Sequence, residues 1–346
     1  MATQRRALGG CHRGSEGVSP ASSLPPSLLP AGAWVRAGLR PGFRPEAAVL
    51  DVDGVLIDVR ASFRDAVRET VVTMQRLIGV RDPWRPSRQD IVELKSARGF
   101  NDDIDVSIAL TAIGAAGRQA ELQGLRTAVD DVGGGLAGLR LVAPDLQRID
   151  GSLVLRIFDE LYWGADEIQR RTGEPARLAP PGPGLEAREA VLVAADFPAR
   201  VRALGPRVIG VISGRTPAEM VLALGKLGWV TGDVDVIVTG DVIRKPDPGC
   251  LDRVVDVTGV RSLVYVGDVR DDWELVRRYR DERGGATEAR GVLVGAGGDV
   301  TSMRELGVDA TLDRTQDLIA LLEIWAQEGA QNSPPEPYVQ AGPAKS

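Results

Sequence analysis

The sequence predicts an α/β fold in which a parallel sheet flanked by helices is interrupted by a helical segment. Two observations support this prediction. From residue 190 onward, short apolar runs alternate with helical patterns, which is typical of parallel sheets with helices on both faces. From about residue 61 to 165, the apolar residues follow helical spacing, with few strand-like runs. The chain of 346 residues is long enough for one large domain or two smaller ones.

The first predicted strand covers 47–50, where a short apolar run leads into Asp51 and Asp53. Such a run is typical of a buried strand that meets a loop. Ser62 then begins the pattern of a capping box, which predicts the start of a helix. Gly79 is expected to end that helix.

Four further strands are expected at 207–212, 234–238, 263–266 and 291–294. The helix after the first of them is expected to begin at Thr216, because a proline follows it and a glutamate stands three positions later. The strand at the start of the chain is expected to join the same sheet as these later strands.

The expected domain division follows from these patterns and from two stretches of loose composition. The first 45 residues contain six arginines and a single acidic residue, and proline and glycine pairs interrupt them. The division predicts a disordered N-terminal tail at 1–45, an α/β core at 46–60 and 190–328, a helical insertion with its linker at 61–189, and a disordered C-terminal tail at 329–346.

The composition argues against several mechanisms and partners. The single histidine, His12, lies in the irregular N-terminal stretch, so neither a Ser-His-Asp triad nor a three-histidine zinc site is expected. The two cysteines, Cys11 and Cys250, provide neither a disulfide framework nor a Cys-x5-Arg motif, and they fit a cytoplasmic location. No run of 18 apolar residues occurs and the net charge is −6, so neither a membrane nor a nucleic acid is expected as a partner.

Polar residues follow the predicted core strands. In chain order they are Asp51 and Asp53, Ser213 and Gly214, Lys245, and Asp268 and Asp272. Ligands of parallel sheets bind at the carboxyl ends of the strands. Clustered carboxylates favour a bound cation, and all-oxygen ligation suits Mg²⁺ together with a substrate phosphate. A hydroxyl and an ammonium group can hold the phosphate oxygens. The sequence therefore predicts a Mg²⁺-assisted phosphoryl-transfer site with a carboxylate available as nucleophile.

These residues resemble the four motifs of the haloacid dehalogenase (HAD) superfamily. The matching segments are Asp51-Val-Asp53-Gly54-Val-Leu, Ser213, Lys245-Pro246-Asp247-Pro248, and Gly267-Asp268 with Asp271-Asp272. The resemblance covers roughly 47–325 and implies a Rossmann-like core, with the helical insertion acting as a cap domain.

The resemblance implies a phosphatase of the HAD type. Asp51 would attack phosphorus and become an aspartyl-phosphate. Asp53 would protonate the leaving oxygen and then activate water, and its presence favours phosphate esters over carbon–halogen bonds. The phosphoryl oxygens would be held by Ser213, Gly214 and Lys245. Lys245 would also steady Asp51. The ligands of Mg²⁺ would be Asp51, the backbone carbonyl of Asp53, Asp268 and, through water, Asp272 in preference to Asp271.

A cap that closes over the site implies a small phosphorylated metabolite as substrate. Lys95 and Asn101, in the insertion, are the expected substrate contacts. Histidinol phosphate, sugar phosphates and phosphoglycolate-like acids all remain open. Three alternatives also remain: a phosphomutase, a phosphonate-cleaving hydrolase that uses Lys95 as a Schiff-base amine, and a catalytically silent binding module.

Overall fold

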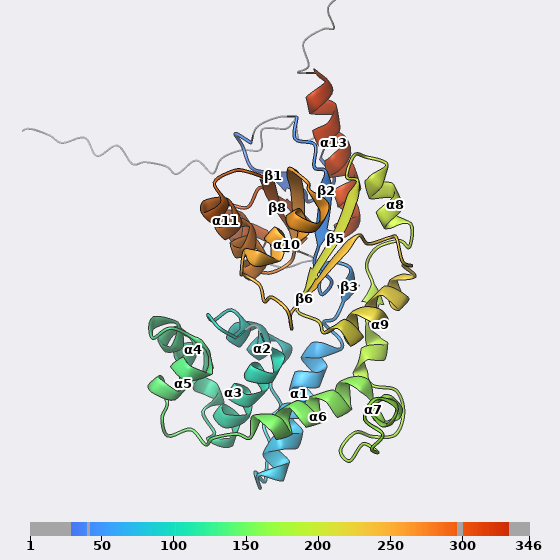
Figure 1. The fold of residues 1–346 in the computed structure, drawn as a ribbon. Coiled ribbons are helices and arrows are strands. Elements are labelled where there is room, and N and C mark those ends of the chain that lie inside the picture. The colour runs from blue at the N-terminus through green and yellow to red at the C-terminus, as the bar shows by residue number, and fades with distance from the viewer. Residues whose placement is uncertain (1–28, 40–41, 101, 296–299, 332–346) are drawn as a thin grey trace, which may run out of the picture. The chain divides into compact units, whose positions relative to one another are not determined.

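The computed structural model describes residues 29–331 apart from 40–41, 101 and 296–299, so the predicted contact Asn101 lies outside the described residues. Seven strands form the main sheet, in the order β1-β9-β8-β7-β2-β5-β6 (Figure 1). They are β1 (Trp34–Val35), β2 (Ala47–Leu50), β5 (Val208–Ser213), β6 (Val236–Thr239), β7 (Ser262–Gly267), β8 (Glu288–Val294) and β9 (Ala310–Leu312). β8 pairs in parallel with both β7 and β9. The predicted α/β fold with a mostly parallel sheet is confirmed.

All five predicted strands are present, but the sheet begins earlier in the chain than predicted. β1 pairs antiparallel with β9, with Trp34 opposite Thr311. The guanidinium of Arg36 lies 2.6 Å from the carboxylate of Asp309, which is fully buried. The prediction of a disordered tail over 1–45 is therefore wrong for residues 34–36, because backbone pairing and a buried acid hold them against the sheet.

The described residues between about 61 and 165 are mainly helical, as predicted, and further helical turns follow up to residue 188. These elements are α1 (Phe63–Leu77), α2 (Arg88–Lys95), α3 (Asp103–Ala115), η1 (Gln119–Glu121), α4 (Leu122–Asp131), α5 (Gly135–Val142), α6 (Gly151–Trp163), α7 (Ala165–Thr172) and η2 (Leu185–Arg188). Aromatic rings bind α1 to α6. The ring of Phe63 stacks on that of Tyr162 with centroids 4.7 Å apart, and Phe158 lies beside both.

The remaining helices alternate with the strands of the main sheet. They are α8 (Phe197–Arg202), α9 (Pro217–Leu227), α10 (Gly249–Thr258), α11 (Arg270–Arg283), α12 (Val300–Glu305) and α13 (Leu318–Gln331), with a short turn η3 (Thr315–Asp317) before the last. α13 continues into the stretch that the sequence assigns to the C-terminal tail. Over the part of the chain that the structure describes, no helix is both long enough and apolar enough to cross a membrane.

Both predicted helix starts are confirmed, since α1 follows Ser62 and α9 follows Thr216, but only Thr216 makes the predicted capping bonds. α9 begins at Thr216 as predicted, since the Thr216 hydroxyl accepts from the backbone N–H of Glu219 and the Glu219 carboxylate accepts from that of Thr216. The capping box predicted at Ser62 is wrong. The Ser62 hydroxyl donates instead to the Val59 carbonyl at 3.0 Å and lies 3.3 Å from a carboxylate oxygen of Glu189.

The chain divides into two compact units. The first unit comprises Met1–Val49, Pro198–Gly210 and Ile243–Ser346, and the second comprises Leu50–Phe197 and Val211–Val242. The second unit therefore contains the helical insertion together with the residues that directly follow β2 and β5. The division into core and cap that the sequence suggests remains a prediction.

A small two-stranded sheet links the two chain segments that enter and leave the insertion. In this connecting ribbon, β3 (Ile57–Asp58) pairs antiparallel with β4 (Ala190–Val191). Below it, the N–H of Leu192 donates to the carbonyl of Leu56 at 2.9 Å. The ribbon therefore connects the loop after β2 with the end of the linker.

The half-buried acid Asp159 on α6 makes the stability of the second unit depend on pH. Burial, together with the nearby negative charge of Glu219, raises the pKa of Asp159 from 3.8 to about 6. The folded protein therefore binds this proton more tightly than the unfolded chain does. The resulting stabilisation is complete below about pH 4 and is lost as the pH rises through about 6.

We therefore expect Asp159→Asn to gain stability relative to the wild type as the pH rises. The gain between pH 4 and pH 8 should be about 1 kcal/mol, since partial exposure of the carboxyl weakens the effect. Thermal denaturation of both proteins across this pH range measures it. A difference between the two proteins that does not change with pH would contradict the assignment.

Candidate active site

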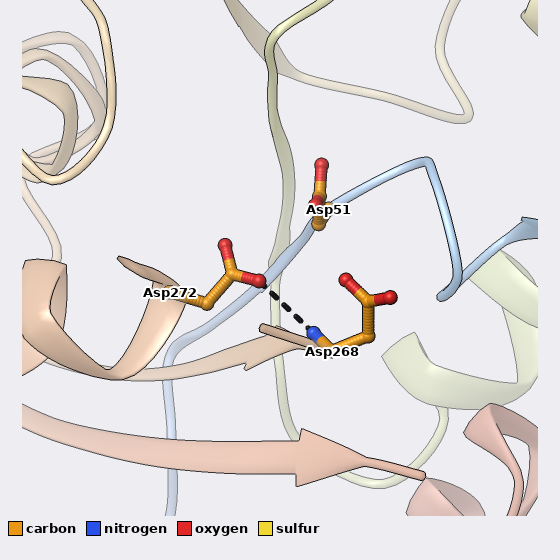
Figure 2. Close-up of side chains that lie close together, drawn as sticks. All are labelled: Asp51, Asp268 and Asp272. Atoms are coloured by element: carbon orange, nitrogen blue, oxygen red, sulfur yellow. Dashed lines mark hydrogen bonds between the residues drawn. The ribbon is translucent and has the colours of Figure 1, made fainter. Parts of the chain in front are cut away.

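Three carboxylates meet at the carboxyl ends of β2 and β7, which are neighbours in the sheet. Asp51 directly follows β2, Asp268 directly follows β7, and Asp272 lies in the first turn of α11. Each offers one oxygen atom, and these three atoms lie within 4.8 Å of one another (Figure 2). Asp51 is 4% exposed and Asp272 is fully buried. The cluster contains Asp272 rather than its neighbour Asp271.

Asp272 is held by four donors. Its Oδ1 accepts from the ammonium of Lys245 and from the hydroxyl of Tyr265, each at 2.8 Å. Its Oδ2 accepts from the backbone N–H groups of Asp268 at 2.9 Å and Val269 at 3.1 Å. Burial opposes ionisation of this carboxyl, but the charge of Lys245 and these hydrogen bonds outweigh it and hold the pKa of Asp272 below its ordinary value. Asp272 is therefore a carboxylate at neutral pH.

The close approach of α11 to β7 requires a glycine at the end of the strand. A Cβ atom at Gly267 would lie 2.2 Å from the Cβ and Cγ atoms of Asp272. Only the absence of a side chain at Gly267 lets the carboxylate of Asp272 sit beside the strand end.

Ser213 and Gly214 stand at the end of β5, as predicted. Ser213 is 2% exposed, and its hydroxyl oxygen accepts from the backbone N–H of Arg215 at 3.2 Å. Gly214 lies against the turn after β6, since a Cβ at Gly240 would come within 2.7 Å of its carbonyl oxygen. Both residues belong to the second unit, as does Asp53.

Asp53 forms an ion pair that the sequence did not predict. The Nε of Arg215 donates to Oδ1 of Asp53 at 2.9 Å, and an Nη2–Oδ1 distance of 2.7 Å brings a second guanidinium nitrogen to the same oxygen. The Arg215 side chain is 2% exposed and that of Asp53 is 30% exposed. Burial alone would lower the pKa of Arg215, but the charges of Asp53 and Glu189 raise it, so the guanidinium stays charged.

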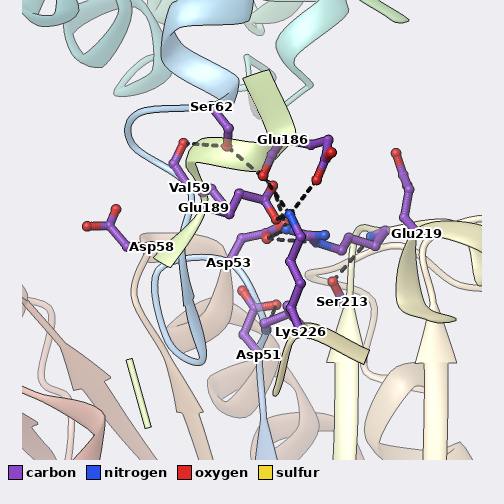
Figure 3. Close-up of polar contacts among 12 residues, drawn as sticks. Asp51, Asp53, Asp58, Val59, Ser62, Glu186, Glu189, Ser213, Glu219 and Lys226 are labelled. Atoms are coloured by element: carbon purple, nitrogen blue, oxygen red, sulfur yellow. Dashed lines mark hydrogen bonds and ion pairs between the residues drawn. The ribbon is translucent and has the colours of Figure 1, made fainter. Parts of the chain in front are cut away.

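Glu189 is the second acid beside Arg215, and it lies directly before the connecting ribbon. Its Oε1 is 3.2 Å from the guanidinium and accepts from the hydroxyl of Tyr162 at 2.6 Å. Its Oε2 is 2.9 Å from the ammonium of Lys226 (Figure 3). The Glu189 side chain is completely buried, so it depends on these partners for its charge.

Lys95 occupies a different environment from the one expected of a substrate contact. Its ammonium is 2.8 Å from the carboxylate of Asp103, at the start of α3, and the side chain is 32% exposed. In the structure its partner is therefore an acid of the insertion. A role for Lys95 at the substrate remains a prediction.

Sequence reasoning missed Arg215 and Glu189 for identifiable reasons. Of the 42 basic residues, 38 are arginine, so a single arginine carries little information by itself. Glu189 stands in a loose linker and shows no motif. The one usable signal was position, because Arg215 comes two residues after the predicted phosphate-binding Ser213.

Comparison with known proteins gives matches among solved structures. No family model matches the sequence, and no curated protein matches it. Phosphatase Tt82 from Thermococcus thioreducens is 27% identical with a TM-score of 0.59, over 80% of this chain and 99% of that one. A protein from Lactobacillus delbrueckii subsp. bulgaricus, assigned as a phosphoglycolate phosphatase, is 19% identical with a TM-score of 0.50, over 81% and 99% of the two chains. These neighbours share the fold described above.

Proposed function

We propose that this chain, which has the fold of the HAD-superfamily phosphatases, is a Mg²⁺-dependent phosphatase that hydrolyses a small phosphomonoester. The observation that carries the proposal is the meeting of Asp51, Asp268 and Asp272 at adjacent strand ends. Oxygen ligands in this number at the carboxyl ends of parallel strands suit Mg²⁺ together with the phosphate of a substrate.

The residues present fit the metal. One oxygen from each of the three carboxylates lies within 4.8 Å of the others, and the ammonium of Lys245 is 2.8 Å from Asp272. Neighbouring carboxylates repel each other, and a bound cation would relieve that repulsion. Asp51, Asp268 and the backbone carbonyl of Asp53 would hold Mg²⁺, and Asp272 would support it through a water molecule. When bound, Mg²⁺ draws negative charge from the phosphate oxygens and so makes phosphorus easier to attack.

The chain's own residues supply the remaining chemistry. A carboxylate oxygen of Asp51 forms a bond to phosphorus while the bond from phosphorus to the ester oxygen breaks, and Asp53 delivers a proton to that leaving oxygen. Water then attacks the phosphorus of the aspartyl-phosphate, Asp53 takes its proton, and Asp51 is regenerated. Ser213, Gly214 and Lys245 are the groups that would hold the phosphoryl oxygens.

Phosphate release from a panel of small monoesters tests the function. The panel contains p-nitrophenyl phosphate, 2-phosphoglycolate, glycerol 3-phosphate, glucose 6-phosphate and histidinol phosphate. We expect release from at least one of them with Mg²⁺, and a loss of at least 100-fold in EDTA that added Mg²⁺ restores. Unchanged release in EDTA would contradict the metal assignment, and no release from any ester would contradict the proposed function.

A further inference from the structure

Asp53 is tied to a buried charged network that lies wholly within the second unit. The members are Asp53, Arg215, Glu189, Lys226 and Glu186, with Tyr162 and Ser62 as neutral donors. Figure 3 shows Asp53, Glu189, Glu186 and Lys226 converging from the loop after β2, the linker and α9. Of these residues, the proposed mechanism uses only Asp53, so the role of the other charges needs an explanation.

Arg215 holds one particular oxygen of Asp53. Two guanidinium nitrogens, Nε and Nη2, lie 2.9 Å and 2.7 Å from Oδ1. A guanidinium is planar and rigid, so two contacts to one carboxylate oxygen fix where that oxygen lies. Because the backbone anchors the other end of the side chain, holding Oδ1 also sets the rotation of the carboxyl group about the Cβ–Cγ bond.

Glu189 in turn fixes Arg215. It is itself held from three helices: Ser62 precedes α1, Tyr162 lies on α6 and Lys226 lies on α9. The ammonium of Lys226 lies 2.9 Å from Glu189 and 2.6 Å from the Glu186 carboxylate. Glu189 therefore has two cationic partners, Lys226 and Arg215. The Nη2 of Arg215 that approaches Oδ1 of Asp53 also lies 3.2 Å from Oε1 of Glu189, so Glu189 holds the guanidinium beside Asp53.

The amount of buried charge argues against a purely architectural role. The network buries an arginine at 2% exposure and a glutamate at 0%, and apolar side chains of similar size would hold a linker at least as well. The network ends on Asp53, which at 30% side-chain exposure is more accessible than either of them. The buried guanidinium of Arg215 lies between a buried acid, Glu189, and a partly exposed acid, Asp53. This arrangement is suited to hold Asp53 in place.

We infer that Arg215 and Glu189 are positioning residues for Asp53, which set the direction in which its carboxyl group delivers a proton to the leaving oxygen of a phosphomonoester. This inference rests on the proposed function. The guanidinium of Arg215 holds Oδ1 of Asp53. Glu189, which directly precedes the connecting ribbon, holds the guanidinium. Neither residue contacts the reacting phosphorus.

The test compares esters that differ in their need for a proton. An alkoxide leaving group needs protonation, whereas p-nitrophenolate leaves without it. The reporter is kcat/KM, which covers steps up to the departure of that group. The variants are Arg215→Met, Arg215→Lys and Glu189→Gln. Arg188→Met is the matched control, because Arg188 stands next to Glu189, is 58% exposed and pairs with Asp65.

We expect Arg215→Met to lower kcat/KM about 100-fold for the panel's best alkyl ester and tenfold or less for p-nitrophenyl phosphate, since general acid catalysis contributes about 10²–10⁴-fold. Arg215→Lys and Glu189→Gln should show the same selectivity with losses of about tenfold for the alkyl ester. Arg188→Met should leave both esters unchanged.

Equal losses for both esters, or no loss for either, in any Arg215 or Glu189 variant that keeps the wild-type melting temperature would overturn the inference. If Arg215→Met does not fold, Arg215→Lys and Glu189→Gln decide the question. A wild type that hydrolyses neither ester refutes the proposed function itself, which is a different result from an active wild type whose variants lack the leaving-group selectivity.

Discussion

Asp51→Asn is expected to lower phosphate release by at least 1,000-fold while the protein stays folded. The amide of asparagine is not a nucleophile toward phosphorus, and removing a covalent nucleophile costs several decades in rate. Asp51 follows β2 and is 4% exposed, so an isosteric amide fits the same space. The measurement is kcat on the best ester of the panel with saturating Mg²⁺.

A matched control separates this effect from a general loss of charge. Asp145→Asn removes one carboxylate from a side chain that is 68% exposed and paired with Arg118. This variant should retain full activity. If Asp51→Asn keeps more than about 1% of the wild-type kcat, the covalent mechanism is wrong, because residual catalysis of that size is too large for an enzyme without its nucleophile.

Asp272→Ala is expected to have the largest effect on stability, a loss of about 3–5 kcal/mol in the free energy of unfolding. The substitution leaves the ammonium of Lys245 without the carboxylate that now accepts from it, and it also removes the acceptor of the Tyr265 hydroxyl. Two backbone N–H groups lose their acceptor as well. Urea denaturation in EDTA measures the change without a contribution from bound metal.

The companion variant Lys245→Met identifies the ion pair as the cause. Removing Lys245 alone leaves the Asp272 carboxylate buried without its cation, so this variant should also be destabilised. The double variant Lys245→Met/Asp272→Ala should lose less than the sum of the two single losses, because neither partner is then left unpaired. Additive losses would show that the two side chains do not depend on each other.

The same pair predicts how the effect of Asp272→Ala depends on pH. The pKa of Asp272 is held below its ordinary value of 3.8, so its stabilising contribution is complete above that value and is lost as the pH falls. The difference between the wild type and Asp272→Ala should therefore shrink in acid.

The sequence predicted the parts of the fold that carry periodic signals. Strands β2, β5, β6, β7 and β8 are four to seven residues long, and each was expected at its position from a short apolar run. β1, β3 and β4 contain two residues each, which is too short for any periodicity. β9, with three residues, was missed for the same reason. The capping bond predicted at Ser62 does not form, because a hydroxyl has several possible hydrogen-bond partners within reach and tertiary contacts decide among them.

The candidate site was predictable where chemistry follows strand ends and unpredictable where it depends on contacts between distant residues. The positions of Asp51, Asp268 and Asp272 after predicted strands sufficed to place carboxylates at one sheet edge. The solved structures that share the fold include phosphatase Tt82. Glu189 is 26 residues from Arg215, and Arg215 is 162 residues from Asp53. No local pattern reports such contacts, which depend on how the linker returns beside the loop after β2.

Trapping the aspartyl-phosphate on Asp51 tests the central claim most directly. The wild type is mixed with its best ester and Mg²⁺, quenched within one turnover and reduced with borohydride, which converts an aspartyl-phosphate to homoserine. Peptide mass spectrometry should then find homoserine at position 51 in the wild type and unmodified asparagine at that position in Asp51→Asn. An active wild type in which position 51 remains aspartate at every quench time, or in which another residue is reduced, would contradict the account.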